Sequence, residues 1–124
     1  MLKVVTEMTK LLTTEKVSSP DHRGIVFDCL GNTAAVKSDA VSAKALQGLT
    51  TMTAKETNET AVTFGIDAAL LHLKVLLASG SDNAEVATSI KAGVAALASP
   101  RASLRKTWAR GMGELIWNGT GALR

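Results

Sequence analysis

Apolar residues recur every three or four positions along almost the whole chain, and this spacing restricts the possible folds more than any other feature. In the first segment it is carried by Leu2, Val5, Met8 and Leu12, which would share one face of a helix. No stretch alternates apolar and polar residues over a useful length, so we predict no β-strand. The spacing therefore predicts an all-α chain whose turns lie where it is interrupted.

Residues that favour helix starts divide the chain into six predicted helices. The pairs Ser19-Pro20 and Ser99-Pro100 combine a capping serine with a proline in the first turn, where the missing N–H removes no hydrogen bond. Asn58 is the expected cap of the most apolar segment, and Asp82 to Glu85 have the spacing of a capping box. The residues expected to face the core are Leu2, Val5, Met8 and Leu12; Ile25, Val26, Cys29 and Leu30; Val41, Ala45, Leu49 and Met52; Val62, Ile66, Ala69, Leu70, Leu73, Leu76 and Leu77; Val86, Ile90, Val94 and Leu97; and Leu104, Trp108, Met112 and Leu115.

Glycines lie inside these predicted helices, where each costs about 1 kcal/mol relative to alanine. Close packing between helices is the expected compensation, and a helix break, above all at Gly65, is the alternative. The pair Gly31-Asn32 is expected to end the second helix, because both residue types tolerate the left-handed conformation found at helix ends.

The spacing of the even-numbered helices suggests a repeat. Their starts at Ser19, Asn58 and Ser99 are 39 and 41 residues apart, close to the helix-pair unit of about 40–47 residues in HEAT and armadillo arrays. We predict an α-solenoid of about three HEAT-like helix pairs, six antiparallel helices in all. Its approximate repeats are 1–33, 38–80 and 82–118 within a single helical-repeat segment, and we expect this segment to be a fragment of a longer solenoid.

Positive charge is concentrated toward the C-terminal end. The net charge is +3, and residues 1–80 are neutral, so residues 81–124 supply the whole excess. Four cations fall within ten residues: Arg101, Arg105, Lys106 and Arg110. Such a cluster can attract an acidic partner such as nucleic acid, although a solvated helix face is the alternative interpretation.

Trp117 lies nine residues after Trp108, so the two indoles point to opposite sides of the predicted last helix. With Trp108 in the core, Trp117 shares its face with Lys106 and Arg110, which is typical of a partner surface or of the docking site of a further repeat. A tryptophan covered by the C-terminal tail is the alternative. We predict Lys106, Arg110 and Trp117 as partner contacts, with Arg101 and Arg105 adjacent; an intramolecular partner is the alternative for Arg105.

The sequence contains no recognisable catalytic or metal-binding pattern. With one cysteine and two histidines, it offers too few ligands for a dedicated zinc site. We interpret Cys29 as a buried inert thiol, His22 as a surface residue of a first helical turn and His72 as a half-buried packing residue. No catalytic residue, cofactor or metal is predicted, and the chain is predicted not to be an enzyme; an enzyme whose site leaves no sequence pattern is the remaining alternative.

The predicted location is a reducing compartment. A single cysteine excludes a disulfide framework, and the segment after Met1 lacks the apolar stretch of a signal peptide. No apolar run is expected to approach the roughly 18 residues needed to span a membrane, so no membrane partner is expected.

Three segments resemble the N-terminal region of the fungal general-control translational activator, the giant HEAT-repeat protein that works upstream of the initiation-factor-two alpha kinase. The most distinctive reads Thr-Thr-Glu-Lys-Val-Ser-Ser-Pro-Asp-His-Arg at residues 13–23. Residues 54–59, and residues 104–108 continuing to 113–117, are similar to the same region and follow in the same order.

The resemblance implies a short piece of a very long solenoid that is associated with translating ribosomes. That family transmits the amino-acid-starvation signal to the kinase together with an ATP-binding-cassette co-activator, and no catalytic residue carries over. We therefore expect a non-enzymatic cytoplasmic scaffold segment whose partners are neighbouring HEAT repeats and the ribosome, through ribosomal protein and rRNA phosphates. The alternative is a free-standing helical module that binds a protein or peptide and is unrelated to ribosomes.

Overall fold

The computed structural model of the chain describes residues 1–13 and 18–122, with side chains described as far as Leu115. There is no β-strand within these residues, and the prediction of an all-α chain with six α-helices is confirmed. The elements are α1 (Leu2–Thr13), α2 (Pro20–Asn32), the 3-10 helix η1 (Thr33–Val36), α3 (Asp39–Lys55), α4 (Glu59–Ala78), α5 (Ala84–Ala96) and α6 (Ala102–Ala122).

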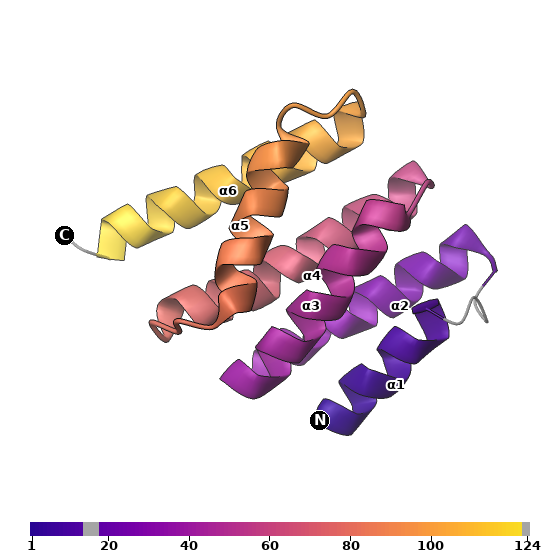
Figure 1. The fold of residues 1–124 in the computed structure, drawn as a ribbon, viewed down its shortest axis with the longest axis horizontal. Helices are drawn as coiled ribbons and strands as arrows, with labels where there is room; N and C mark the ends of the chain where they lie inside the picture. The colour runs from indigo at the N-terminus through magenta and orange to yellow at the C-terminus, as the bar shows by residue number, and fades with distance from the viewer. Residues whose placement is uncertain (14–17, 123–124) are drawn as a thin grey trace.

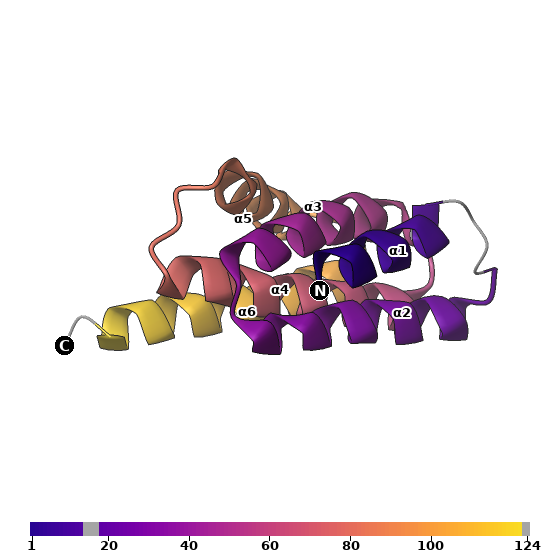
Figure 2. The same cartoon turned by 90° about the horizontal axis from the view of Figure 1, so that it is seen from below.

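The helices form three pairs that stack side by side in two layers (Figure 1). The first layer holds α1, α3 and α5, and the second holds α2, α4 and α6, as the edge-on view of Figure 2 shows. Helices α2 and α4 run parallel, because a Cβ at Gly24 would meet Phe64 and, seven residues later, a Cβ at Gly31 would meet Leu71. This stacking agrees with the predicted helix pairs, although α5 crosses its neighbours at a steep angle (Figure 1).

The starts of α2 and α4 agree with the predicted capping residues, but the predicted start at Ser99-Pro100 is wrong, because α6 begins at Ala102 and both residues lie in the turn before it. Pro20 lies in the first turn of α2, and Asn58 begins α4 by accepting a hydrogen bond from the backbone N–H of Ala61 at 2.9 Å. The start of α5 is one residue later than the capping box predicted, because its cap is Asn83 and not Asp82.

The predicted end of the second helix at Gly31-Asn32 is confirmed, since α2 ends at Asn32. The expected left-handed conformation there is wrong, because the chain continues into η1 and the left-handed residue is Lys37, with a φ of 55°. Gly65 does not break α4. A Cβ at Gly65 would overlap the methyl group of Thr53, so this glycine allows α3 and α4 to approach closely, which is the compensation expected for glycines inside helices.

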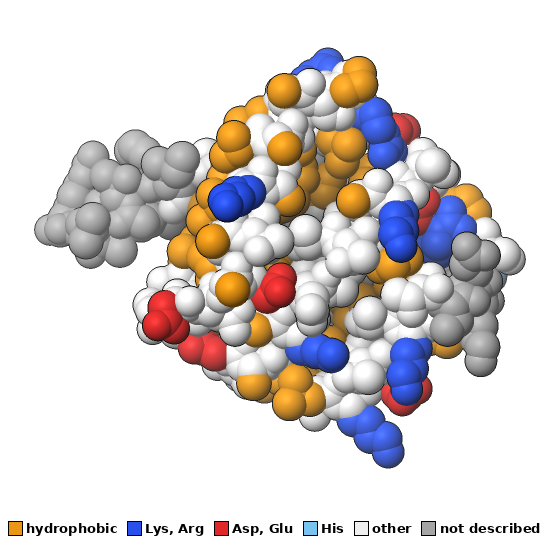
Figure 3. All heavy atoms as spheres, viewed as in Figure 1, with side chains coloured by type: hydrophobic (Ala, Val, Ile, Leu, Met, Phe, Trp, Pro, Cys, Tyr) orange, Lys and Arg blue, Asp and Glu red, His pale blue; other side chains and the backbone are white. Residues whose placement is uncertain are grey.

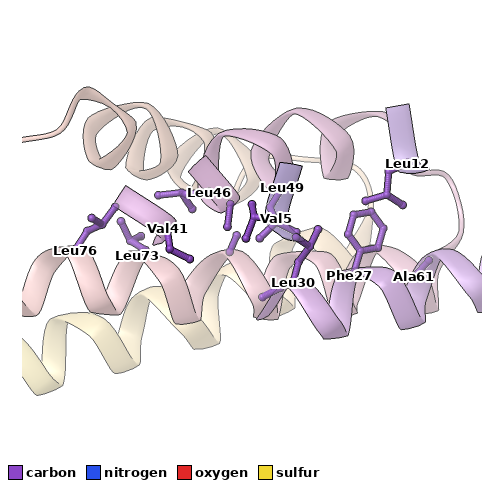
Figure 4. Packing of buried hydrophobic residues seen from close by; sticks show 13 residues of the cluster. Val5, Leu12, Phe27, Leu30, Val41, Leu46, Leu49, Ala61, Leu73 and Leu76 are labelled. Carbon is purple, nitrogen blue, oxygen red and sulfur yellow. The ribbon is translucent and has the colours of Figure 1, made fainter. Parts of the chain in front are cut away.

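The core lies between the two layers (Figure 4). Phe27 and Leu30 point from α2 into this space, where they join Val5 of α1 and Leu49 of α3 in one buried cluster. Figure 4 also shows Leu73 of α4 in the same space. Because the cluster is densely packed between the two layers, each helix that contributes to it can turn only one face inward.

The predicted core face of α2 is wrong at Ile25, whose side chain is 61% exposed. The helix buries Gly24, Phe27, Leu30 and Gly31 instead. A hydrophobicity pattern does not mark glycine as a core residue, so the pattern predicts a core face that is rotated away from the observed one. Two further predicted core residues near helix ends, Leu2 and Leu77, are also exposed.

The predicted core face of α5 is wrong toward its C-terminal end, although Val86 and Ile90 pack against the core as predicted. Its two buried residues are Ser89 and Gly93, whereas Val94 and Leu97 are 56% and 44% exposed. Gly93 accommodates the ring of Trp108, since a Cβ there would be 2.8 Å from the ring atom Cε3. Hydrophobic side chains consequently gather on the outside of α5 (Figure 3).

Helix α4 is the central helix of the fold. Contrary to the sequence-based expectation, its 20 residues are long and apolar enough to cross a membrane by length and composition, with a mean hydropathy of 1.7. Half of its most apolar 18-residue stretch is buried inside the protein. The helix contacts α2, α3 and α6. Its apolar character is therefore explained by its position in the core.

Candidate functional site

The start of α6 carries the four predicted cationic contacts, and packing fixes which of them face outward. Trp108 is 4% exposed and packs against Val62 and Ile66 of α4, which confirms its predicted place in the core. Residues on the other side of the helix must then point away from the protein. Lys106 and Arg110 are exposed there.

Arg101 is bound to the loop that joins α3 to α4. Its Nη2 donates to Glu59 Oε1 at 2.7 Å, and its Nη1 donates to the backbone carbonyl of Glu56 at 2.8 Å. The side chain is 29% exposed. Hydrogen bonds from Ser103 and Arg101 lower the pKa of Glu59. Arg101 therefore connects the start of α6 to the preceding helix pair.

Arg105 also has an intramolecular partner, the alternative that its position near the core stripe suggested. Its Nη1 donates to the backbone carbonyl of Ser99 at 2.7 Å. This hydrogen bond closes the turn before α6. Arg105 is half-buried, so its guanidinium acts mainly within the fold.

Lys106 and Arg110 are the most accessible of the four cations. Arg110 Nη2 is 3.3 Å from Asp67 Oδ1, and these side chains are 64% and 47% exposed. Exposed pairs of this kind contribute little to stability and leave the cation open to a partner. Lys106 has no ion-pair partner among the described residues. The side chain of the third predicted contact, Trp117, lies outside the described residues.

Sequence reasoning missed a second arginine that binds the same loop. Arg23 of α2 holds Glu56 through Nε to Oε1 at 2.6 Å and Nη2 to Oε2 at 3.0 Å. The side chain of Glu56 is 4% exposed. Burial alone would raise the pKa of Glu56, but hydrogen bonds from Arg23 and from the N–H groups of Asn58 and Thr57 outweigh it and lower the pKa.

The only signal for this pair was the resemblance itself. Arg23 ends the segment 13–23 and Glu56 lies in the segment 54–59, so two stretches that resemble the same region meet in space. Arg23 and Arg101 approach the loop from the neighbouring helices α2 and α6. The loop thus connects all three helices of the second layer.

The described histidines and the cysteine differ partly from their predicted roles. His72 was expected to be half-buried, but it is 0% exposed. Its Nε2 lies 2.7 Å from the carbonyl of Leu30, and its Nδ1 lies 3.0 Å from Ser42 Oγ. Cys29 is half-buried, not fully buried. His22 is exposed, as predicted.

The comparison with protein families gives one match. The family model described as General control nonderepressible 1 (Gcn1) N-terminal matches residues 20–123. No curated protein and no solved structure matched the chain. The family match confirms the resemblance to the N-terminal region of the general-control activator. Since it extends over most of the residues, the chain belongs to the Gcn1 N-terminal family.

Proposed function

We propose that the chain is a non-enzymatic scaffold segment of a ribosome-associated activator of the kinase that controls translation during amino-acid starvation. The observation that carries this proposal is the family match over residues 20–123. The stacked helix pairs support it, because such arrays offer long surfaces for partners. The proposed location is the cytoplasm, and the proposed partners include neighbouring HEAT repeats and an ATP-binding-cassette co-activator.

The proposed ribosome contact is the exposed side of α6 around Lys106 and Arg110. Both cations are accessible, and both can bind phosphate oxygens of rRNA or acidic groups of ribosomal protein. Arg101 and Arg105 position the start of the helix through their intramolecular hydrogen bonds. Trp117 remains a predicted contact on the same helix.

Co-sedimentation of the purified chain with ribosomes at 50 mM and 200 mM salt tests this contact. Two neutralised phosphates give a logarithmic salt slope of about −2, so we expect about a tenfold loss of affinity across this range. The double variant Lys106→Glu/Arg110→Glu should remove binding at both concentrations.

Lys44→Glu/Lys91→Glu is the matched control, because it reverses two exposed lysines on α3 and α5 and makes the same change in net charge. Equal binding by the two double variants would contradict the proposed contact. If a folded, monomeric chain does not sediment with ribosomes at low salt, the alternative of a helical module unrelated to ribosomes is favoured.

A further inference from the structure

An apolar groove lies where α2 and α4 end, beside η1 and the start of α3. Its volume is about 640 Å³. We call it the seam groove. Its apolar lining comes from both sides of the α2–α4 contact and from η1: Gly31, Ala34, Ala35, Leu71, Val75 and Ala78.

Two glycines on α2 explain why large side chains stand beside this groove. A Cβ at Gly24 would be 3.2 Å from Phe64 Cδ2, and one at Gly31 would be 3.0 Å from the Cβ of Ala68. The ring of Phe64 packs against Gly24, and the side chain of Leu71 packs against Gly31. Both side chains lie at the surface, 42% and 49% exposed. Ile25, 61% exposed, lies next to Gly24 on α2.

The exposed apolar residues have the spacing that receives a helix. Phe64, Leu71 and Ala78 follow one another at intervals of seven residues on one side of α4. The 14 steps from Phe64 to Ala78 extend for about 21 Å. An amphipathic helix of about four turns would match this length, with apolar residues at i, i+3, i+4 and i+7 toward the groove.

The charges differ between the groove and the preceding part of α2. Lys37 and Lys74 line the groove, and Asp21 and Asp28 lie on exposed positions of α2 before the part of that helix that lines the groove. Among the described residues, none of these four has an ion-pair partner. Asp39 also borders the lysine end, where it lies in the first turn of α3 and is favoured by the dipole of that helix.

Lys37 is placed there by an uncommon backbone conformation. Its φ of 55° is in the left-handed region, which favours glycine. A lysine at this position keeps a positive charge at the end of the groove at some conformational cost. Residues in such conformations concentrate at binding sites.

We propose that the seam groove binds an amphipathic helix of a partner protein. The apolar side of that helix covers Phe64 and Leu71. Its acidic end lies beside Lys37 and Lys74, and its basic end lies beside Asp21 and Asp28. The four unpaired charges select this partner over a uniformly charged helix. This surface adjoins the proposed ribosome contact, because Leu71 and Lys74 also line a pocket with Arg110, but the proposal does not depend on ribosome binding.

A designed peptide is the probe. It has 14 residues, leucines at i, i+3, i+7 and i+10, glutamates at one end and lysines at the other, and a fluorescent label. Fluorescence anisotropy measures its binding to the folded chain. We expect Lys37→Glu/Lys74→Glu to weaken binding about tenfold, and to strengthen binding of a second peptide in which lysine replaces every glutamate. Lys44→Glu/Lys91→Glu, with the same net charge, should bind the first peptide like the wild-type chain.

A second pair of variants tests the apolar part. Phe64→Ser/Leu71→Ser removes two exposed side chains, so the fold should be retained, as circular dichroism can check, and binding should be lost. A scrambled peptide without an apolar side should not bind.

Three results would overturn the proposal. The first is equal affinity of the designed peptide for the wild-type chain and for Lys37→Glu/Lys74→Glu. The second is no binding up to about 1 mM peptide, the weak limit of a specific contact. The third is concentration-dependent dimerisation that Phe64→Ser/Leu71→Ser abolishes, because a second copy of the chain would then occupy the groove. None of these results bears on ribosome sedimentation.

Discussion

His72 connects three helices from inside the core. Its Nε2 must carry the proton that it donates to the carbonyl of Leu30 in α2, so Nδ1 is free to accept from the hydroxyl of Ser42 in α3. Burial favours this neutral form of the ring. Burial lowers the pKa of His72, and the hydrogen bond to Leu30 opposes this only in part.

The burial of His72 predicts that the protein loses stability in mild acid. In the unfolded chain the histidine pKa is about 6.5, so the unfolded state binds the proton first as the pH falls. The stabilisation is complete above pH 6.5 and is lost from there down to the lower pKa of the folded state. Between pH 7.5 and pH 5.5 the free energy of unfolding should fall by about 1 kcal/mol, which urea titrations can measure.

The matched variants for this pH effect are His72→Gln and His22→Gln. The first removes the buried titrating group and should flatten the pH dependence, whatever its own stability at pH 7.5. The second changes an exposed residue and should keep the wild-type dependence. If the free energy of unfolding of the His72→Gln variant falls by the same amount over this pH range, another group is responsible. The pKa values of Glu56 and Glu59 are lowered. Both carboxylates therefore stay ionised when the measurements are made above pH 5.

Arg23 stabilises the fold much more than Arg110 does, although each forms an ion pair. Arg23→Ala would leave the buried carboxylate of Glu56 with only its backbone donors, so we expect a loss of about 2 to 3 kcal/mol in the free energy of unfolding. Arg110→Ala breaks an exposed pair and should cost less than about 1 kcal/mol. Denaturant unfolding of both variants at neutral pH checks the difference, and equal losses would contradict it.

At the scale of helices, two glycines should respond in opposite ways to the same substitution. Gly65→Ala puts a methyl group into Thr53, and we expect destabilisation of about 1 to 3 kcal/mol in spite of the better helix propensity. Gly113→Ala meets no atom within 4 Å on α6, so it should stabilise by up to about 1 kcal/mol. Thermal unfolding of the two variants measures both effects, and a stabilised Gly65→Ala chain would show that α3 and α4 can separate without loss.

The starts of α2 and α4 were predictable from sequence because the relevant interactions are local. Asn58 caps α4 through an N–H only three residues away, and Pro20 needs no partner beyond its own turn. The buried faces of α2 and α5 were not predictable in the same way. Each is set by a small residue, Gly31 or Gly93, that a neighbouring helix approaches, and no pattern within the helix itself shows this.

At the scale of the molecule, the spacing of helix starts indicated the stacked pairs because each pair advances the chain by a similar number of residues. Contacts between helices of neighbouring pairs span a similar number of residues. For example, Arg110 of α6 contacts Asp67 of α4, which lies 43 residues earlier. The candidate contacts were only partly predictable. Charge density pointed to the start of α6, but it could not show that Arg101 and Arg105 are bound within the fold.

The three pairs are not equally well anchored, and α5 is the weakest element. Its 13 residues bury only Ser89 and Gly93, whereas α4 buries nine of its residues. Its link to α3 includes a hydrogen bond of 3.3 Å between the hydroxyls of Ser89 and Thr50. Segments with few buried apolar contacts open locally at a smaller free energy than the whole protein.

We therefore expect hydrogen exchange at the amides of α5 to be at least about tenfold faster than in α4 under native conditions. Mass spectrometry of peptides from α3, α4 and α5 measures this, with α3 as the comparison from the same layer. Trp108→Leu removes the ring that packs against Gly93, so it should speed exchange in α5 more than in α1. Equal protection of α5 and α4 would contradict this, because opening of α5 would then require unfolding of the core beneath it.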